Sequence, residues 1–216
     1  MRLLLIRHGE TEHNAGRLAL GRADVSLNER GLSQAQALAT RLHGSDLYGH
    51  IDAVYASPLQ RAQATASPLA EACGLAIVTE TALIEMDIGA LEGLSFPDVR
   101  ERYPEFMRAW LSEDVADAEM PGGESLRQVQ ERAWAAVQSI RERHSEATVA
   151  AVTHNFVILT LLCRALDLPL SRFRRLRQDL GAVSTLDMTD ARATAVVLND
   201  TCHLEGSGVT GQESGA

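Results

Sequence analysis

The chain has 216 residues, of which 45% are hydrophobic and 23% are charged, as in a globular protein with one large domain or at most two small ones. Its net charge of −9 argues against nucleic acid or an anionic membrane as a partner, and no apolar stretch is long enough to span a bilayer. All twenty basic residues are arginines, which excludes Schiff-base chemistry, lysine-anchored pyridoxal phosphate and the lysine of a phosphate-binding P-loop.

The first segment of the chain combines an apolar run with polar residues at its end. Leu3–Ile6 are four consecutive large aliphatic residues, which predicts a short buried strand of a parallel sheet. Arg7, His8 and Gly9 follow directly, so this strand delivers a cation and an imidazole to the carboxyl edge of the sheet, where open α/β sheets bind ligands. Because Met1–Ile6 is too short for a signal peptide, we expect cytoplasmic residence.

Helical and strand patterns then alternate along the chain. Apolar spacing predicts four long helices, at about 28–43, 57–73, 125–144 and 155–166. Strands are expected at 51–56, 76–78, 148–153, 183–188 and 194–198, the last two as a closing hairpin. Three serines stand three residues before a Glu or Gln, the spacing of a capping box at a helix start: Ser26, Ser57 and Ser125.

Residues 94–123 have a different character, because aromatic residues and prolines cluster there. Short helices separated by prolines predict a small helical cap inserted into the fold. The fold class that we predict is therefore α/β, a three-layer α/β/α sandwich with a mostly parallel central sheet and a small helical cap insertion. We expect one domain over residues 1–205, with the cap at about 94–123 and a disordered Gly/Ser-rich tail at 206–216.

Polar residues follow several of the predicted strands. Arg7 and His8 follow the first strand, and His154 ends the strand at 148–153. Arg61 lies at the start of the helix after the second strand, and Glu85 follows the third. In a parallel sheet with right-handed crossovers these side chains reach one edge, where arginines and histidines beside helix N-termini suit a dianionic phosphate. A zinc site at His8, Glu85 and His154 is the alternative, but no HExxH motif supports it.

The remaining histidines and the cysteines carry no such pattern. His13, His43, His50, His144 and His203 fall in loops or polar helix ends and are expected at the surface. Three widely spaced cysteines argue against a disulfide framework, and Cys73 and Cys163 are expected to be buried thiols because they lie among aliphatic residues.

Arg7-His8-Gly9-Glu10-Thr11, together with Asn14, resembles the signature of the histidine phosphatase superfamily, which has the phosphoglycerate mutase-like fold. The resemblance covers roughly residues 1–200. It continues through Leu27-Asn28-Glu29-Arg30-Gly31, Ser57-Pro58-Leu59-Gln60-Arg61, Glu85 with Gly89 and Glu92-Gly93, Pro121-Gly122-Gly123-Glu124-Ser125, and Thr153-His154-Asn155.

This resemblance implies a role for each matching residue. His8 would be the nucleophile that forms a phosphohistidine, Glu85 the general acid and base, and His154 the third catalytic residue. The phosphate-binding residues that the resemblance implies are Arg7, Asn14, Arg61, His154 and Asn155. Gly21 would contact the substrate, and neither a metal nor a cofactor is implied.

The residues after the acid, Glu85, and the arginines of the cap distinguish the mutases of this family from its phosphatases. The family's mutases carry an aromatic residue and a glycine after the acid and adjacent arginines in the cap. Here Met86 follows Glu85, and Arg100, Arg102 and Arg108 are not adjacent. We therefore expect a metal-independent phosphatase that hydrolyses small organic phosphate monoesters. A cofactor-dependent phosphoglycerate mutase and a non-catalytic binder of phosphorylated ligands remain alternatives, and the apolar closing strand leaves a homodimer open.

Overall fold

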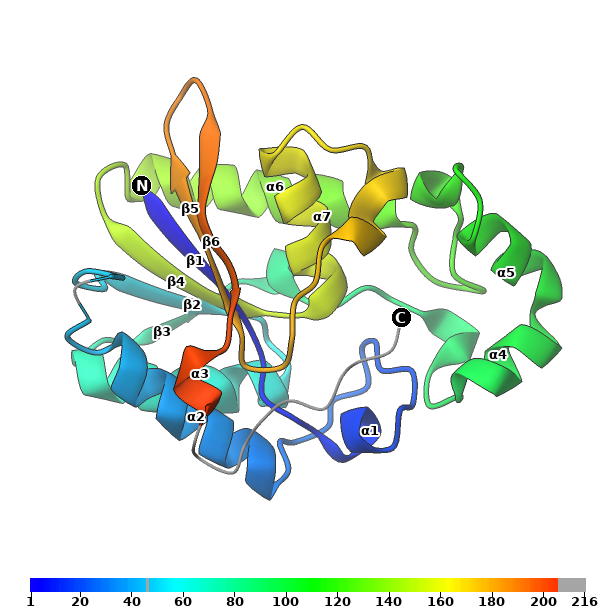
Figure 1. Cartoon of the computed structure of the whole chain (residues 1–216), viewed down its shortest axis with the longest axis horizontal. Helices are drawn as coiled ribbons and strands as arrows, with labels where there is room; N and C mark the ends of the chain where they lie inside the picture. The colour runs from blue at the N-terminus through cyan, green and yellow to red at the C-terminus, as the bar shows by residue number, and fades with distance from the viewer. Residues whose placement is uncertain (46, 206–216) are drawn as a thin grey trace.

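A six-stranded sheet forms the centre of the computed structural model, which describes residues 1–45 and 47–205 (Figure 1). The strand order is β3-β2-β4-β1-β5-β6. β1, β2, β3 and β4 run parallel, β5 pairs antiparallel with β1, and β6 pairs antiparallel with β5. The strands are β1 (Arg2–Arg7), β2 (Ala53–Ala56), β3 (Ile77–Thr79), β4 (Thr148–Thr153), β5 (Val183–Met188) and β6 (Ala193–Asp200). The expected tail at 206–216 lies outside the described residues.

Helices cover both faces of this sheet. They are α1 (Glu12–Ala15), α2 (Glu29–Leu42), α3 (Gln60–Cys73), α4 (Phe96–Arg102), α5 (Pro104–Trp110), α6 (Leu126–Arg143) and α7 (Asn155–Ala165). In Figure 1, α6 and α7 lie on one side of the strands and α2 and α3 on the other. The predicted three-layer α/β/α sandwich with a mostly parallel sheet is confirmed.

β1 is buried on both faces because its side chains alternate between two hydrophobic clusters. Leu3 and Leu5 belong to the cluster that contains the inner faces of α6 and α7. Leu4 and Ile6 belong to the cluster that contains those of α2 and α3. A strand enclosed in this way has little freedom to shift its register, so the residues that follow it are held in fixed positions.

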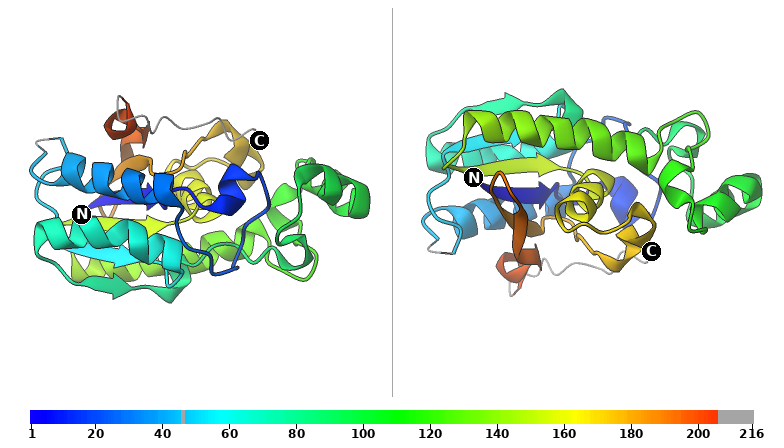
Figure 2. Two further views of the ribbon diagram at one scale, coloured as in Figure 1. Left: turned by 90° about the horizontal axis from the view of Figure 1, so that it is seen from below. Right: turned by 90° about the horizontal axis from the view of Figure 1, so that it is seen from above.

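The segment expected to form a cap contains α4 and α5. Ser95 caps α4, and Pro97 and Pro104 lie in the first turns of α4 and α5, where proline fits a helix. Figure 2 shows both helices beyond the carboxyl ends of the parallel strands, the edge at which the predicted catalytic residues emerge. The Trp110 ring packs edge-on against Phe156 at the start of α7, with the ring centroids 5.8 Å apart.

Only one of the three predicted capping boxes is present. Ser125 and Gln128 form it at the start of α6. The prediction at Ser26 is wrong, since Asn28 caps α2 by accepting the Gly31 N–H at 2.9 Å. Asparagine caps helices as well as serine does, and Asn28 lies next to the first helical residue.

The prediction at Ser57 is also wrong. Helix α3 starts at Gln60 without a side-chain cap, because the Ser57 hydroxyl binds an imidazole at 2.7 Å and receives the Leu59 N–H, which precedes the helix, at 3.4 Å. Among the cysteines, Cys163 is buried as expected, whereas Cys73 is only half-buried.

The loop after β1 lies directly against the first turn of α2. A Cβ built on Gly9 would lie 2.6 Å from the Gly31 carbonyl oxygen, and a Cβ built on Gly31 would lie 2.1 Å from the Glu10 carbonyl oxygen. Both distances are far inside van der Waals contact with backbone atoms, which cannot rotate away. Glycine at both positions therefore allows two backbone segments to pack together and holds the loop that carries His8.

Gly31→Ala is expected to lower the free energy of unfolding. Alanine in a helix gains about 0.5–1 kcal/mol over glycine, but the overpacking costs about 1–3 kcal/mol or more against a fixed backbone. Urea denaturation followed by circular dichroism measures the difference. Leu32→Ala is the matched control, since Leu32 is 54% exposed at the next position. A Gly31→Ala protein as stable as the wild type would contradict this packing argument.

Candidate active site

His8 lies at the carboxyl end of β1 and is buried, with 3% of its surface exposed. Its backbone N–H donates to the Thr153 carbonyl at the end of β4, 3.0 Å away. Its Nδ1 lies 2.7 Å from the Gly9 carbonyl oxygen, so Nδ1 carries the proton and donates it. Arg61 Nε donates to the other ring nitrogen, Nε2, at 3.3 Å, which requires a lone pair there.

The charge state of His8 agrees with this tautomer. Burial, together with the positive charges of Arg61 and Arg7, holds the pKa of His8 well below its ordinary value. The imidazole is therefore neutral at pH 7. A neutral ring with a fixed Nδ1–H presents its Nε2 lone pair as a nucleophile.

His154 follows β4 directly and is the last residue before α7, whose start it does not cap with its side chain. It is fully buried, and its ring centroid lies 5.1 Å from that of His8. Its Nε2 lies 2.7 Å from the Ser57 hydroxyl. Its Nδ1 is buried and has no hydrogen-bond partner among the residues that the structure describes. Burial and the neighbouring His8 and Arg61 hold its pKa well below the ordinary value.

Two arginines flank the pair of imidazoles. Arg61 is fully buried in the first turn of α3, and its two terminal nitrogens donate to the carbonyls of Ala23 at 2.8 Å and Gly21 at 2.6 Å. Arg7 donates through Nη1 to the Gln178 carbonyl at 2.6 Å, and burial lowers its pKa to about 10. The buried Nε of Arg7, like Nδ1 of His154, has no partner within the described part of the chain.

Glu85 lies in the loop after β3 and is 3% exposed. Its Oε1 accepts the Met86 N–H at 2.8 Å, and its Oε2 lies 3.5 Å from the Phe156 N–H at the start of α7. Burial raises the pKa of this carboxyl, although the Met86 N–H and the Arg61 charge oppose the rise. A carboxyl group with a raised pKa keeps its proton to a higher pH than an ordinary glutamate and can give it up in a reaction.

The three other predicted site residues are Asn14, Asn155 and Gly21. Asn14 receives the Thr11 N–H and hydroxyl at its side-chain oxygen, which leaves its amide nitrogen as a donor. Asn155 is half-buried at the first position of α7. Gly21 is buried, and its backbone is already engaged by Arg61 and by Glu92 Oε1 at 2.8 Å. Its contact with a substrate therefore stays a prediction.

Together these side chains have the charge and the free donors that could bind a tetrahedral anion. Two buried nitrogens without partners, Arg7 Nε and His154 Nδ1, and the unprotonated Nε2 of His8 belong to residues that the ends of neighbouring strands bring together. Charge-assisted donors of this kind bind phosphate oxygens. No group of three or more His, Cys, Asp or Glu within residues 1–45 and 47–205 is arranged to hold a metal ion.

Arg132 of α6, for which no role was predicted, binds the acid loop, residues 82–85, which ends at Glu85. Its Nη1 donates to the carbonyls of Ala82 and Ile84, each at 2.7 Å, and its Nη2 donates to the Glu85 carbonyl at 3.1 Å. The Glu124 carboxylate binds the same guanidinium at 3.0 Å through both oxygens. The five hydrogen bonds of Arg132 thus join three backbone carbonyls of the acid loop, that of Glu85 among them, to the Glu124 carboxylate.

Arg22 and Ser57 are two further residues at the site that the sequence analysis did not predict there. Arg22 donates to the Glu85 carbonyl at 3.2 Å and pairs with Glu124 at 3.1 Å, so the loop after α1 is tied to the acid loop. Two of the residues involved lie inside the family motifs: Glu124, the partner of Arg22, and Ser57 itself. The resemblance implied no role in the site for either of them.

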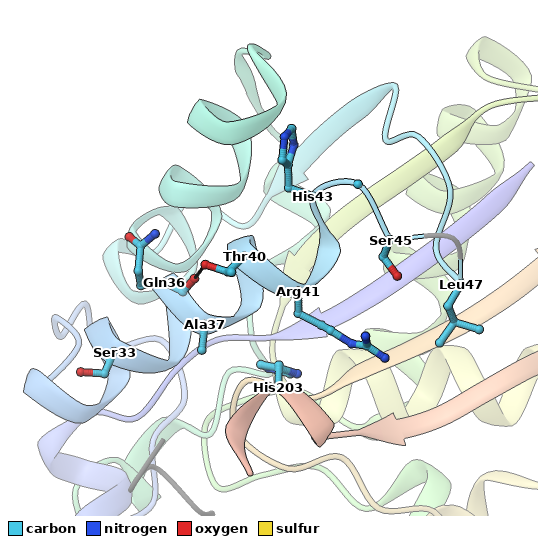
Figure 3. Close-up of a pocket in the computed structure, with 10 residues that line it drawn as sticks. Ser33, Gln36, Ala37, Thr40, Arg41, His43, Ser45, Leu47 and His203 are labelled. Atoms are coloured by element: carbon cyan, nitrogen blue, oxygen red, sulfur yellow. Dashed lines mark hydrogen bonds between the residues drawn. The ribbon is translucent and has the colours of Figure 1, made fainter. Parts of the chain in front are cut away.

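A separate surface hollow of about 920 Å³ lies between α2 and a short 3₁₀ helix, Cys202–Leu204 (Figure 3). Arg41 and His203 line it, and none of the converging site residues does. His203 is half-buried, as are His13 and His144, so the surface prediction is right only for His43 and His50. Burial lowers the pKa of His203. This hollow is not part of the candidate active site.

Comparisons with known proteins agree with this geometry. The family model described as histidine phosphatase superfamily (branch 1) matches residues 3–201. The chain is 37% identical to phosphoserine phosphatase 1 of Hydrogenobacter thermophilus over 94% of each chain. It is 39% identical to the bifunctional protein Rv2228c of Mycobacterium tuberculosis, over 94% of this chain but 55% of that protein.

A solved structure agrees as well. The α-ribazole phosphatase of Shigella flexneri superimposes with a TM-score of 0.82 at 32% identity, covering 93% of this chain and 96% of that one. Among the described helices, none is both long and apolar enough to cross a membrane. The match over almost the whole chain, together with the paired histidines at the sheet edge, shows that this protein belongs to branch 1 of the histidine phosphatase superfamily.

Proposed function

We propose that the protein is a metal-independent phosphatase that hydrolyses small organic phosphate monoesters through a phosphohistidine at His8. The observation that carries this proposal is the fixed tautomer of His8, whose Nδ1–H is bound by Gly9 and whose Nε2 receives only a donor. A binder of phosphate would gain more from a second N–H donor at Nε2 than from a lone pair. The lone pair is what a nucleophile requires.

The proposed reaction has two steps. His8 Nε2 attacks phosphorus, the bond from phosphorus to the ester oxygen breaks, and Glu85 gives its proton to the departing alkoxide. The Glu85 carboxylate then removes a proton from water, whose oxygen attacks phosphorus and breaks the bond to Nε2. Inorganic phosphate leaves, and both residues return to their starting protonation states.

The anion-binding residues act on the charge that develops during each step. Arg7, Arg61 and His154 would donate to the oxygens of the transferred phosphoryl group, and Asn14 and Asn155 would add amide donors to it. Because arginine side chains supply this positive charge, the reaction proposed here requires no metal ion. Burial also strengthens each of these interactions relative to water.

The alcohol part of the substrate would lie towards the cap. Trp110 packs against Phe106, Phe156 and Phe173, so an aromatic cluster borders the side of the site on which Glu85 protonates the leaving group. This surface favours an organic alcohol with apolar or sugar character over a second anionic group. α-Ribazole phosphate, named for one relative, has a sugar in its alcohol part and is the first candidate on this ground; phosphoserine, named for another relative, carries a carboxylate and is the second candidate.

Release of inorganic phosphate from a panel of monoesters tests this proposal. The panel contains p-nitrophenyl phosphate, phosphoserine, α-ribazole phosphate and 3-phosphoglycerate at equal concentrations, with and without EDTA. We expect hydrolysis that EDTA does not reduce. Tight binding without hydrolysis of any ester would identify a non-catalytic binder. Interconversion of 2- and 3-phosphoglycerate stimulated by the bisphosphate would identify a mutase.

A further inference from the structure

Ser57 is fully buried and rigidly held, although it does not cap the helix that follows it. Its backbone N–H donates to the Val152 carbonyl at 3.0 Å, and its carbonyl accepts from Gln63 Nε2 at 2.7 Å. Its hydroxyl lies 2.7 Å from His154 Nε2, a short distance for a hydrogen bond between oxygen and nitrogen. The fixed serine therefore acts on one ring nitrogen of His154.

The direction of this hydrogen bond follows from the groups around the hydroxyl. The Leu59 N–H points to the Ser57 oxygen at 3.4 Å and can only donate. If His154 Nε2 also donated, the hydroxyl proton would have no acceptor among the described residues. Leaving a buried hydroxyl proton without an acceptor is unfavourable. The hydroxyl therefore donates to Nε2, and the single proton of the neutral ring lies on Nδ1.

The position of Nδ1 gives this tautomer a consequence for binding. Nδ1 is buried, has no hydrogen-bond partner within the described residues, and belongs to a ring that faces His8. With a proton, Nδ1 donates to a phosphoryl oxygen. With a lone pair, the same nitrogen would repel that oxygen. The identity of the proton-bearing nitrogen therefore decides whether His154 attracts or repels the group that is transferred.

We propose that Ser57 is a positioning residue that fixes His154 as the Nδ1–H tautomer, so that a donor faces the phosphoryl group. The consequence for catalysis rests on the proposed function, whereas the tautomer itself can be measured without turnover. Ser57 touches neither the substrate nor His8 in this account, and its effect passes through His154 alone.

Imidazole ¹⁵N NMR on histidine-labelled protein measures the tautomer directly. At pH 7 we expect His154 to be neutral, with Nδ1 protonated and Nε2 unprotonated, and the spectrum of His154→Gln assigns its signals. The reverse pattern, Nε2 protonated and Nδ1 bare, would overturn the proposal whatever the enzyme hydrolyses. If the wild type hydrolyses no ester while the tautomer is as expected, the proposed function fails and the tautomer assignment survives.

Three substitutions test the consequence for binding and catalysis. Ser57→Ala is expected to lower kcat about 10- to 100-fold and to weaken binding of inorganic phosphate, measured by calorimetry, while His154 populates both tautomers. Ser57→Thr keeps the hydroxyl and should restore most of the kcat. Thr160→Val removes another fully buried hydroxyl, one that donates only to the Val157 carbonyl of its own helix, and should leave kcat unchanged.

A folded Ser57→Ala protein with wild-type kcat, phosphate affinity and His154 tautomer would overturn the proposal. Should Ser57→Ala fail to fold, the wild-type tautomer and the Ser57→Thr spectrum decide the question.

Discussion

His8→Ala is expected to lower the turnover of p-nitrophenyl phosphate by a factor of about 10⁴ or more, because no other buried group at the site can replace the Nε2 lone pair. Binding of inorganic phosphate should be weakened much less, because the guanidinium groups of Arg7 and Arg61 remain. Initial rates and calorimetry measure the two quantities on the same protein. His43→Ala is the matched control, since His43 is exposed and lines the separate hollow.

The contrast between rate and binding makes this substitution informative. A histidine that only binds phosphate would lose affinity and rate together. A His8→Ala protein with more than a few per cent of wild-type turnover would exclude His8 as the nucleophile. His8→Asn, which keeps a polar group in the buried position, provides a second variant if the alanine protein does not fold.

Glu85→Gln is expected to have different effects on two substrates. Glutamine is close in size to glutamate but can neither give a proton to a leaving alkoxide nor take one from water. For phosphoserine we expect kcat to fall about 10²- to 10⁴-fold. p-Nitrophenolate leaves without protonation, so the first step with p-nitrophenyl phosphate should continue while the second slows. Stopped-flow absorbance should then show a burst of p-nitrophenol followed by slow turnover.

The pH dependence follows from the two shifted groups. Burial lowers the pKa of His8, so the nucleophile stays neutral until the pH falls well below the ordinary histidine value. Burial raises the pKa of Glu85, so the acid keeps its proton above the ordinary glutamate value and loses it as the pH rises further. The kcat for phosphoserine should therefore rise through the lowered His8 pKa and decline above the raised Glu85 pKa. Glu85→Gln should lose the alkaline decline. An unchanged pH profile in Glu85→Gln would remove Glu85 from the acid role.

That the site residues lie close together could be predicted, because each of them lies next to a strand or helix that its own neighbours in the sequence predict. His8 and His154 follow strands of four or more buried aliphatic residues, and Arg61 lies in the first turn of a helix. Once parallel strands and right-handed crossovers are assumed, these positions reach the same edge of the sheet. The 5.1 Å between the two imidazole rings is the result of that topology.

The residues that hold this site in place could not be predicted in the same way. Arg132 lies 47 positions from Glu85 in the chain, on a helix whose charged residues look like a solvated face. Ser57 has the spacing of a helix cap, and only the packing of α3 against β4 directs its hydroxyl to His154 instead. Contacts between distant segments carry no periodic signal, so they become visible only in the folded chain.

Trapping the covalent intermediate tests the central claim most directly. Wild-type and Glu85→Gln protein are mixed with p-nitrophenyl phosphate, quenched in alkali, in which phosphohistidine survives, and digested for mass spectrometry. The account predicts one phosphoryl group on His8 at Nε2, in higher amounts in Glu85→Gln, because water attack is slowed there. Phosphate release during turnover with no phosphoryl group on His8 in either protein, or with the group on another residue, would contradict it.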